Sequence, residues 1–229
     1  MKYTREQILL KLEENSSDMS LLYKEPCVNY RGKTADTKEY YTEVIAEWLL
    51  ERLYLFDRIK TITRQSSYCM GGEEHDGIPN RSNSNREEEL IAMAMKRQRT
   101  LPVVGQVLDY QTPLKNVQKD EAGKIDLLAY DGKTLRILEL KKPDSMETML
   151  RCVLEGYTYL QTVDKEKLLR DFKLPEDTEI KASPFVFWNG AQWKEIQQKR
   201  PKLRRLMRVL KSIPYYAVKE NDIYTVTEE

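Results

Sequence analysis

Two carboxylates and an amine stand inside the apolar stretches of residues 124–142, KIDLLAYDGKTLRILELKK. Asp126 lies in the first stretch, and Glu139 and Lys141 lie in the second. The dipeptide Asp131-Gly132 between them is a strong signal for a tight turn, so the two stretches are predicted to form a β-hairpin. The question is what three charged side chains do in strands that are otherwise typical of a core.

The register of this hairpin decides which chemistry it can carry. With Asp131-Gly132 as a two-residue turn, Asp126 faces Ile137, and Glu139 follows two residues further along the same face. The two carboxylates are then diagonal neighbours with Cα atoms about 7–8 Å apart, and both can reach one divalent cation. Lys141 stands one pleat further on that face, whereas a three-residue turn would move Asp126 to the other face. A metal-bound water beside an amine can hydrolyse a phosphodiester bond. The alternative interpretation of the three charged residues is a surface ion pair on a solvated strand.

The elements around the hairpin are predicted from apolar periodicity and from turn residues. Helical spacing over 4–15 and 34–59 precedes a Gly-, Ser- and Asn-rich stretch that indicates a loop. The chain is therefore divided into an α-helical region 1–62, a linker 63–85 and an α/β domain 86–229. The elements predicted in that domain are a helix 86–98, a strand 103–111, the hairpin strands 124–131 and 134–141, a helix 146–163, a strand 183–188, a mostly helical stretch 191–213 and one or two closing strands.

Composition limits the classes of function that this chain can have. Lys and Arg number 38 against 37 Asp and Glu, so a nucleic-acid partner would need a local basic patch rather than a basic protein. The 3 cysteines form no disulfide framework and fit a reducing compartment. No stretch approaches the ~20 apolar residues of a membrane span, and no signal-type apolar segment is present. We expect a cytoplasmic protein with no membrane partner.

The pattern Asp126…Glu139-Leu140-Lys141 on a hairpin resembles the PD-(D/E)xK nuclease superfamily. The predicted α-β-β-β-α-β order is similar to the common core of that family over roughly residues 86–227. The resemblance implies a restriction-endonuclease-like α/β core, a mixed sheet flanked by helices, with the α-helical N-terminal region outside it. Ile125 stands where the eponymous proline of the motif would be.

The resemblance also implies roles for individual residues. Asp126 and Glu139 would hold Mg²⁺ or Mn²⁺, and Lys141 would orient or activate the attacking water. The helix after the E-x-K strand often carries Q-x-x-x-Y in this family, and here Glu155 and Tyr159 take the place of that pair. The glutamate in place of glutamine leaves the role of this helix open.

An acidic residue on the helix before the first strand often completes the metal site in this family. Glu87, Glu88 and Glu89 compete for that role. We expect Glu88, because Ile91 and Ala92 follow it at three and four residues and can pack on the sheet while Glu88 faces its edge. The alternative for all three is a solvated first turn that complements the helix dipole.

The helical stretch 194–211 carries a run of cations against a single glutamate. A basic outer face of this kind suits phosphate contacts, which supply affinity without reading sequence; the alternative is a merely soluble helix face. The residues expected to contact nucleic acid are Lys199, Arg200, Lys202, Arg204, Arg205 and Arg208.

The expected function is metal-dependent hydrolysis of nucleic acid, with DNA favoured over RNA. A non-catalytic nucleic-acid-binding or assembly module on the same fold is the alternative, in which the carboxylates hold no metal. A third possibility is a protein–protein adaptor built on the helix predicted over 37–59. The sequence leaves the oligomeric state open, a dimer included.

Overall fold

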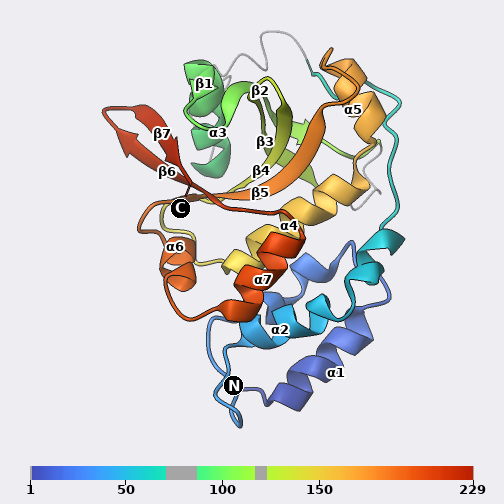
Figure 1. Cartoon of the computed structure of the whole chain (residues 1–229), viewed down its shortest axis with the longest axis vertical. Coiled ribbons are helices and arrows are strands. Elements are labelled where there is room, and N and C mark those ends of the chain that lie inside the picture. The colour runs from blue at the N-terminus through green and yellow to red at the C-terminus, as the bar shows by residue number, and fades with distance from the viewer. Residues whose placement is uncertain (1, 71–86, 117–122, 229) are drawn as a thin grey trace.

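A computed structural model describes residues 2–70, 87–116 and 123–228 of the chain. Its centre is a seven-stranded mixed sheet in which the strands follow one another in chain order (Figure 1). Strands β1 to β4 are antiparallel neighbours, β5 and β6 each run parallel to the strand before, and β7 returns antiparallel. The strands are β1 (Thr100–Leu101), β2 (Gly105–Pro113), β3 (Lys124–Tyr130), β4 (Thr134–Leu140), β5 (Glu179–Phe187), β6 (Tyr215–Glu220) and β7 (Ile223–Thr227).

Helices cover both faces of this sheet. The parallel pairs β4–β5 and β5–β6 each need a crossover connection, and the helices of both crossovers pack on one face, whereas the helix before β1 packs on the other. The α-helices are α1 (Arg5–Asn15), α2 (Tyr41–Leu50), α3 (Glu87–Gln98), α4 (Met149–Thr162), α5 (Lys165–Asp171), α6 (Ala191–Ile196) and α7 (Pro201–Val209). Short 3₁₀ helices are η1 (Leu22–Lys24), η2 (Pro26–Asn29) and η3 (Leu53–Arg58). Each helix in the described ranges is too short or too polar to cross a membrane.

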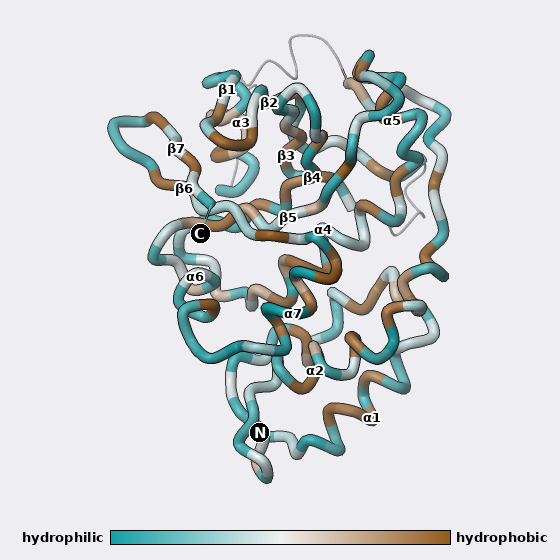
Figure 2. Tube along the Cα trace, viewed as in Figure 1, coloured by the Kyte–Doolittle hydropathy of each residue, from teal (hydrophilic) through white to brown (hydrophobic). Residues whose placement is uncertain are grey.

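Alternating side chains on the central strands pack into two separate hydrophobic cores, one on each face of the sheet. On β4, Leu135 and Ile137 join the core under α4, whereas Leu138 and Leu140 join the smaller core under α3. This alternation is the period of a strand buried on both faces. The predicted mixed α/β architecture is confirmed, with the apolar positions visible in brown along the central strands and helices (Figure 2).

The N-terminal helices share the core of α4. Buried side chains of α1 and α2 pack with those of α4 and α7 in one continuous cluster. Two buried glutamates join these parts by capping helices of other segments. Glu43 on α2 accepts hydrogen bonds from the first N–H groups of α7, and Glu195 on α6 accepts one from Met149 at the start of α4.

The helix expected over 34–59 is shorter than predicted. α2 ends at Leu50, and Leu53–Arg58 forms a 3₁₀ turn instead. The run Leu53-Tyr54-Leu55-Phe56 is apolar throughout and has no helical period, and Leu55 and Phe56 are its buried members. The sequence also did not reveal the two-residue strand β1 or the helix α5. Most of the predicted linker, from residue 71 to residue 85, lies outside the described residues.

Candidate active site

The hairpin register differs from the predicted one by two residues. Tyr130 pairs with Leu135 instead of facing Lys133. The carboxylate of Asp131 accepts a hydrogen bond from the N–H of Lys133 at 2.9 Å, so Asp131 flanks the turn and does not form its centre. The central residues are Gly132 and Lys133, and Gly132 takes a φ of +96°, which glycine adopts without steric cost.

A shift of two residues leaves every side chain on its predicted face. One position beyond the Leu127–Leu138 pair, this register sets Asp126 opposite Glu139 rather than diagonal to it. Directly opposed residues have Cβ atoms about 4.5–5.5 Å apart, closer than the diagonal arrangement. On α4, Gly156 faces this point, and a Cβ at that position would lie 3.5 Å from Cβ of Glu139. The correction therefore brings the two carboxylates nearer to each other.

Lys141 is the centre of a buried charge cluster on the same face. Its Nζ lies 2.7 Å from Oε1 of Glu139, 3.1 Å from Oε2 of Glu147 and 3.4 Å from Oε2 of Glu155. Lys141 is 6% exposed and Glu139 is 2% exposed. The hydroxyl of Tyr159 donates to Oε1 of Glu155 at 3.0 Å, so the α4 pair singled out in the sequence reaches this cluster.

The carboxylate of Asp126 is held by two donors. Its Oδ1 accepts from Nε2 of Gln111 at 2.8 Å, and its Oδ2 accepts from the backbone N–H of Leu140 at 3.0 Å. Sequence reasoning missed Gln111, although β2 pairing places it opposite Asp126 between the Tyr110–Leu127 and Thr112–Ile125 pairs. A polar residue in the neighbouring predicted strand was the available signal.

Glu147 is the second residue that sequence reasoning missed. It lies in the loop before α4 and also pairs with Arg151 at 3.0 Å, an i,i+4 pair. The i,i+4 spacing was visible in the sequence, but the contact with Lys141 depends on how the loop after β4 folds back.

The first turn of α3 lies against the end of β4. Glu88 is partly buried and accepts a hydrogen bond from the backbone N–H of Lys142 at 3.1 Å. Glu87 is exposed and pairs with Nζ of the same lysine at 2.6 Å. Of these two acids, Glu88 is thus the one directed at the backbone next to Lys141. Its role as a third metal ligand stays a prediction.

Burial and mutual repulsion shift the protonation of the cluster. Burial raises the pKa of Asp126 to about 7, and the charges of Glu155 and Glu88 act in the same direction against the attraction of Lys141. Burial and the charge of Asp126 raise the pKa of Glu139 well above its ordinary value. Burial alone would lower the pKa of Lys141, but Glu139 and Glu155 outweigh it and raise that pKa. Lys141 is therefore a cation at neutral pH, surrounded by more acidic groups than its one charge can balance.

The oxygens of this cluster offer a divalent cation few ligands. Oε2 of Glu139 is buried and has no hydrogen-bond partner among the described residues. No three His, Cys, Asp or Glu side chains in the described ranges gather closely enough to hold a metal ion. What the site offers is the opposed pair Asp126 and Glu139. One or two carboxylates with waters is a common way for Mg²⁺ to be bound, so the pair fits such an ion.

The predicted nucleic-acid contacts divide into two groups. Lys202 pairs with Glu47 on α2 at 2.8 Å, Arg204 donates to the carbonyl of Ile196 at 2.6 Å, and Arg200 is buried. Lys202 and Arg204 are therefore committed to contacts inside the molecule, and Arg200 is removed from the outer face by its burial. The other three side chains are exposed: Lys199, Arg205 and Arg208.

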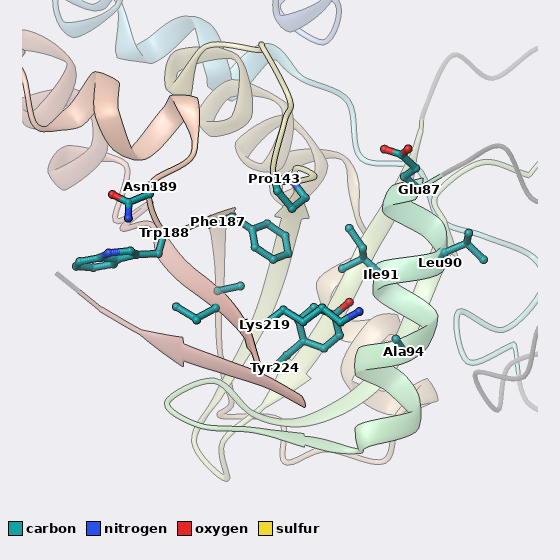
Figure 3. Close-up of a pocket in the computed structure, with 12 residues that line it drawn as sticks. Glu87, Leu90, Ile91, Ala94, Pro143, Phe187, Trp188, Asn189, Lys219 and Tyr224 are labelled. Carbon is teal, nitrogen blue, oxygen red and sulfur yellow. The ribbon is translucent and has the colours of Figure 1, made fainter. Parts of the chain in front are cut away.

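A groove of about 750 Å³ opens on the α3 side of the sheet, next to the end of β4. Glu87 and Ile91 of α3 form one wall, and Tyr224 of β7 and Trp188 after β5 form the other (Figure 3). Pro143, two residues after Lys141, lies at its end. Trp188 is 43% exposed at its rim, so the groove presents an aromatic side chain to solvent.

No family model matches this chain, and no curated protein and no solved structure matches it significantly.

Proposed function

We propose that this protein is a divalent-metal-dependent nuclease that hydrolyses phosphodiester bonds, with DNA favoured as substrate, on a restriction-endonuclease-like core. The observation that carries the proposal is the carboxylate pair of the β3–β4 hairpin, in which Glu139 is buried and Asp126 is partly buried, with Lys141 beside it. Oε1 of Glu139 pairs with Lys141 at 2.7 Å, while Oε2 of Glu139 has no hydrogen-bond partner in the described chain. The element order α3-β1-β2-β3-β4-α4-α5-β5 supports the same proposal, because it contains the α-β-β-β-α-β pattern with the short elements β1 and α5 added.

In this proposal Asp126 and Glu139 hold Mg²⁺ or Mn²⁺. The metal supplies Lewis-acid polarisation of the scissile phosphate and lowers the pKa of an attacking water. Glu139 would hold the metal while keeping its ion pair with Lys141 through Oε1, because its other oxygen, Oε2, has no hydrogen-bond partner among the described residues. The two donors on Asp126, Gln111 and the N–H of Leu140, fix its carboxylate before any ligand arrives.

The surroundings of Lys141 indicate which of its two expected roles it takes. Glu139 and Glu155 raise its pKa, so the side chain stays an ammonium at neutral pH. An ammonium cannot accept a proton from water, but it can orient the water and stabilise negative charge on phosphate oxygens. Tyr159 and Glu155 hold this ammonium from the α4 side and act as positioning residues.

The test is calorimetric titration of Mn²⁺ and Mg²⁺ into the wild-type protein and the Asp126→Ala/Glu139→Ala double variant, together with a cleavage panel of plasmid DNA, oligonucleotides and RNA. Saturable metal binding and cleavage in the wild type, both lost in the double variant, would support the proposal. Identical behaviour of the two proteins would refute it. Salt-sensitive nucleic-acid binding without metal binding or cleavage would favour the non-catalytic module instead.

The adaptor alternative has less structural support. Nearly every residue of α2 from Tyr41 to Leu49 is buried, against α1 and α7 among other elements. That helix therefore presents little surface to a protein partner.

A further inference from the structure

A second cavity, of about 630 Å³, lies where three distant segments meet. The loop after β4 contributes Pro143 to Met146, the N-terminal region contributes Arg31 and Tyr40, and residues 189–200 contribute the remaining wall. Pro143 and Asn189 also line the groove of Figure 3, so the two hollows adjoin. None of the residues of the charge cluster around Lys141 lines this cavity.

Arg200 is the unusual residue in its wall. The side chain is only 4% exposed, and its guanidinium carbon lies 3.1 Å from the centre of the Tyr40 ring. Nη2 donates to Gln198 at 2.9 Å, but Nη1 has no hydrogen-bond partner in the part of the chain that the structure describes. A buried charged donor without a partner is costly, so a ligand that accepts from Nη1 would relieve that cost.

The nearest carboxylate does not meet this need. Glu195 lies 3.8 Å from Nε of Arg200, which is beyond hydrogen-bond distance. Its Oε1 accepts from the hydroxyl of Thr42 at 3.1 Å, and its Oε2 accepts from the N–H of Met149 at 2.9 Å. Because both oxygens already have donors, one on α2 and one at the start of α4, Glu195 is fixed in place and leaves Nη1 of Arg200 free for another acceptor.

Further cations surround the same cavity. Lys194 and Arg31 are exposed on its rim, and Arg31 donates to the sulfur of Met146 at 3.3 Å. Three cationic and two acidic side chains line the cavity, and the exposed acid, Asp144, pairs with Lys142 at 3.2 Å. A planar guanidinium with flanking cations is the arrangement that binds phosphate oxygens.

We propose that this cavity binds a phosphoryl group, held by Arg200 with Lys194 and Arg31. The ligand chemistry is a phosphate dianion or monoester, which is either free phosphate or the phosphorylated end of a nucleic-acid strand. The site is distinct from the carboxylate cluster, and its occupancy requires neither metal nor cleavage. It gives Arg200 a role other than the predicted outer-face contact.

The experiment is titration calorimetry in EDTA with inorganic phosphate, and then with one oligonucleotide carrying a phosphate at the 5′ end, at the 3′ end or at neither end. Arg200→Lys keeps the positive charge but loses the planar guanidinium, which can donate two parallel hydrogen bonds. Lys194→Ala removes an exposed cation that folding does not need. Lys133→Ala, in the turn at the other end of β4, is the matched control. Melting curves verify that each variant is folded.

We expect saturable phosphate binding by the wild type, weakened about tenfold or more in Arg200→Lys and Lys194→Ala and unchanged in Lys133→Ala. A tenfold preference for one phosphorylated end would identify a strand terminus as the source, and equal binding of all three oligonucleotides would identify free phosphate. No saturable phosphate binding, or equal binding by all variants, would overturn the proposal. Because EDTA is present throughout, these outcomes do not depend on whether the protein cleaves nucleic acid.

Discussion

Replacing Asp126 by Asn should stabilise the metal-free protein, and the gain should depend on pH. Asp126 lies in a buried cluster with Glu139 and Glu155, and burial raises its pKa from 3.8 to about 7. Asparagine has nearly the same shape and carries no charge. It can accept from the N–H of Leu140 through its oxygen, while the amide of Gln111 turns over to accept from its nitrogen.

The magnitude follows from linkage between protonation and folding. Each unit of pKa shift corresponds to about 1.4 kcal/mol, so the shift of Asp126 is worth about 4 kcal/mol at most. Because the folded pKa lies above the unfolded one, the stability of the protonated state is complete below about pH 4 and lost as pH rises through about 7. Asp126→Asn should therefore gain up to about 4 kcal/mol at pH 8 and about 2 kcal/mol at pH 5. Partial exposure of Asp126 makes both figures upper values.

The assay is urea unfolding of both proteins in EDTA at pH 5, 6.5 and 8. Asp131→Asn is the control, because it neutralises a carboxylate of the same hairpin with the opposite shift. Burial acts to raise the pKa of Asp131, but hydrogen bonds from the N–H groups of Thr134 and Lys133 and the pairing with Arg136 lower it overall. That variant should be less stable than wild type at pH 8. Equal stability of wild type and Asp126→Asn at pH 8, or a difference that does not change with pH, would refute the buried-charge account.

Three further results are expected. Lys141→Met should lower the free energy of unfolding by about 3–5 kcal/mol at pH 8 in urea titrations, because it leaves buried carboxylates uncompensated, and the loss should shrink in a Glu139→Gln background. Glu43→Gln should lower the free energy of unfolding by about 1–2 kcal/mol, because an amide has one acceptor oxygen for the two N–H groups at the start of α7. The control Glu51→Gln, on the exposed end of α2, should lower it by less than about 0.5 kcal/mol. Saturating Mn²⁺ should raise the melting temperature of the wild type at pH 8 and leave that of Asp126→Asn nearly unchanged, which calorimetry would measure; an equal rise in both would contradict the site.

The sequence was enough to predict that the three charged side chains share one face of the hairpin, because side chains alternate strictly between the two faces of a strand. Asp126, Glu139 and Lys141 share a face in any register that differs by an even number of residues. The register itself was not predictable, because the same Asp-Gly dipeptide occurs in two kinds of turn. In one the aspartate is a central residue of the turn, and in the other it is the residue before the turn. The observed choice depends on the hydrogen bond from the N–H of Lys133 to Asp131, which is a local contact with no sequence period.

Contacts between distant segments could not be predicted from periodicity. Gln111 reaches Asp126 only because β2 pairs with β3, and Lys202 turns to Glu47 only because α2 packs on α7. A helical pattern identifies an outer face for an isolated helix, but it does not show which neighbour covers that face. Arg200 shows this most clearly, since a residue predicted to be exposed is buried against Tyr40.

The central claim is most directly tested by one comparison of cleavage rates. Wild type and Glu139→Ala, purified in parallel, are incubated with Mn²⁺ and linear or plasmid DNA. The account predicts cleavage by the wild type and a loss of about 100-fold or more in the variant, since the proposal assigns Glu139 to the metal and Glu139 also pairs with Lys141. Cleavage at the same rate by both proteins, or no cleavage of any nucleic acid by the wild type, would contradict it.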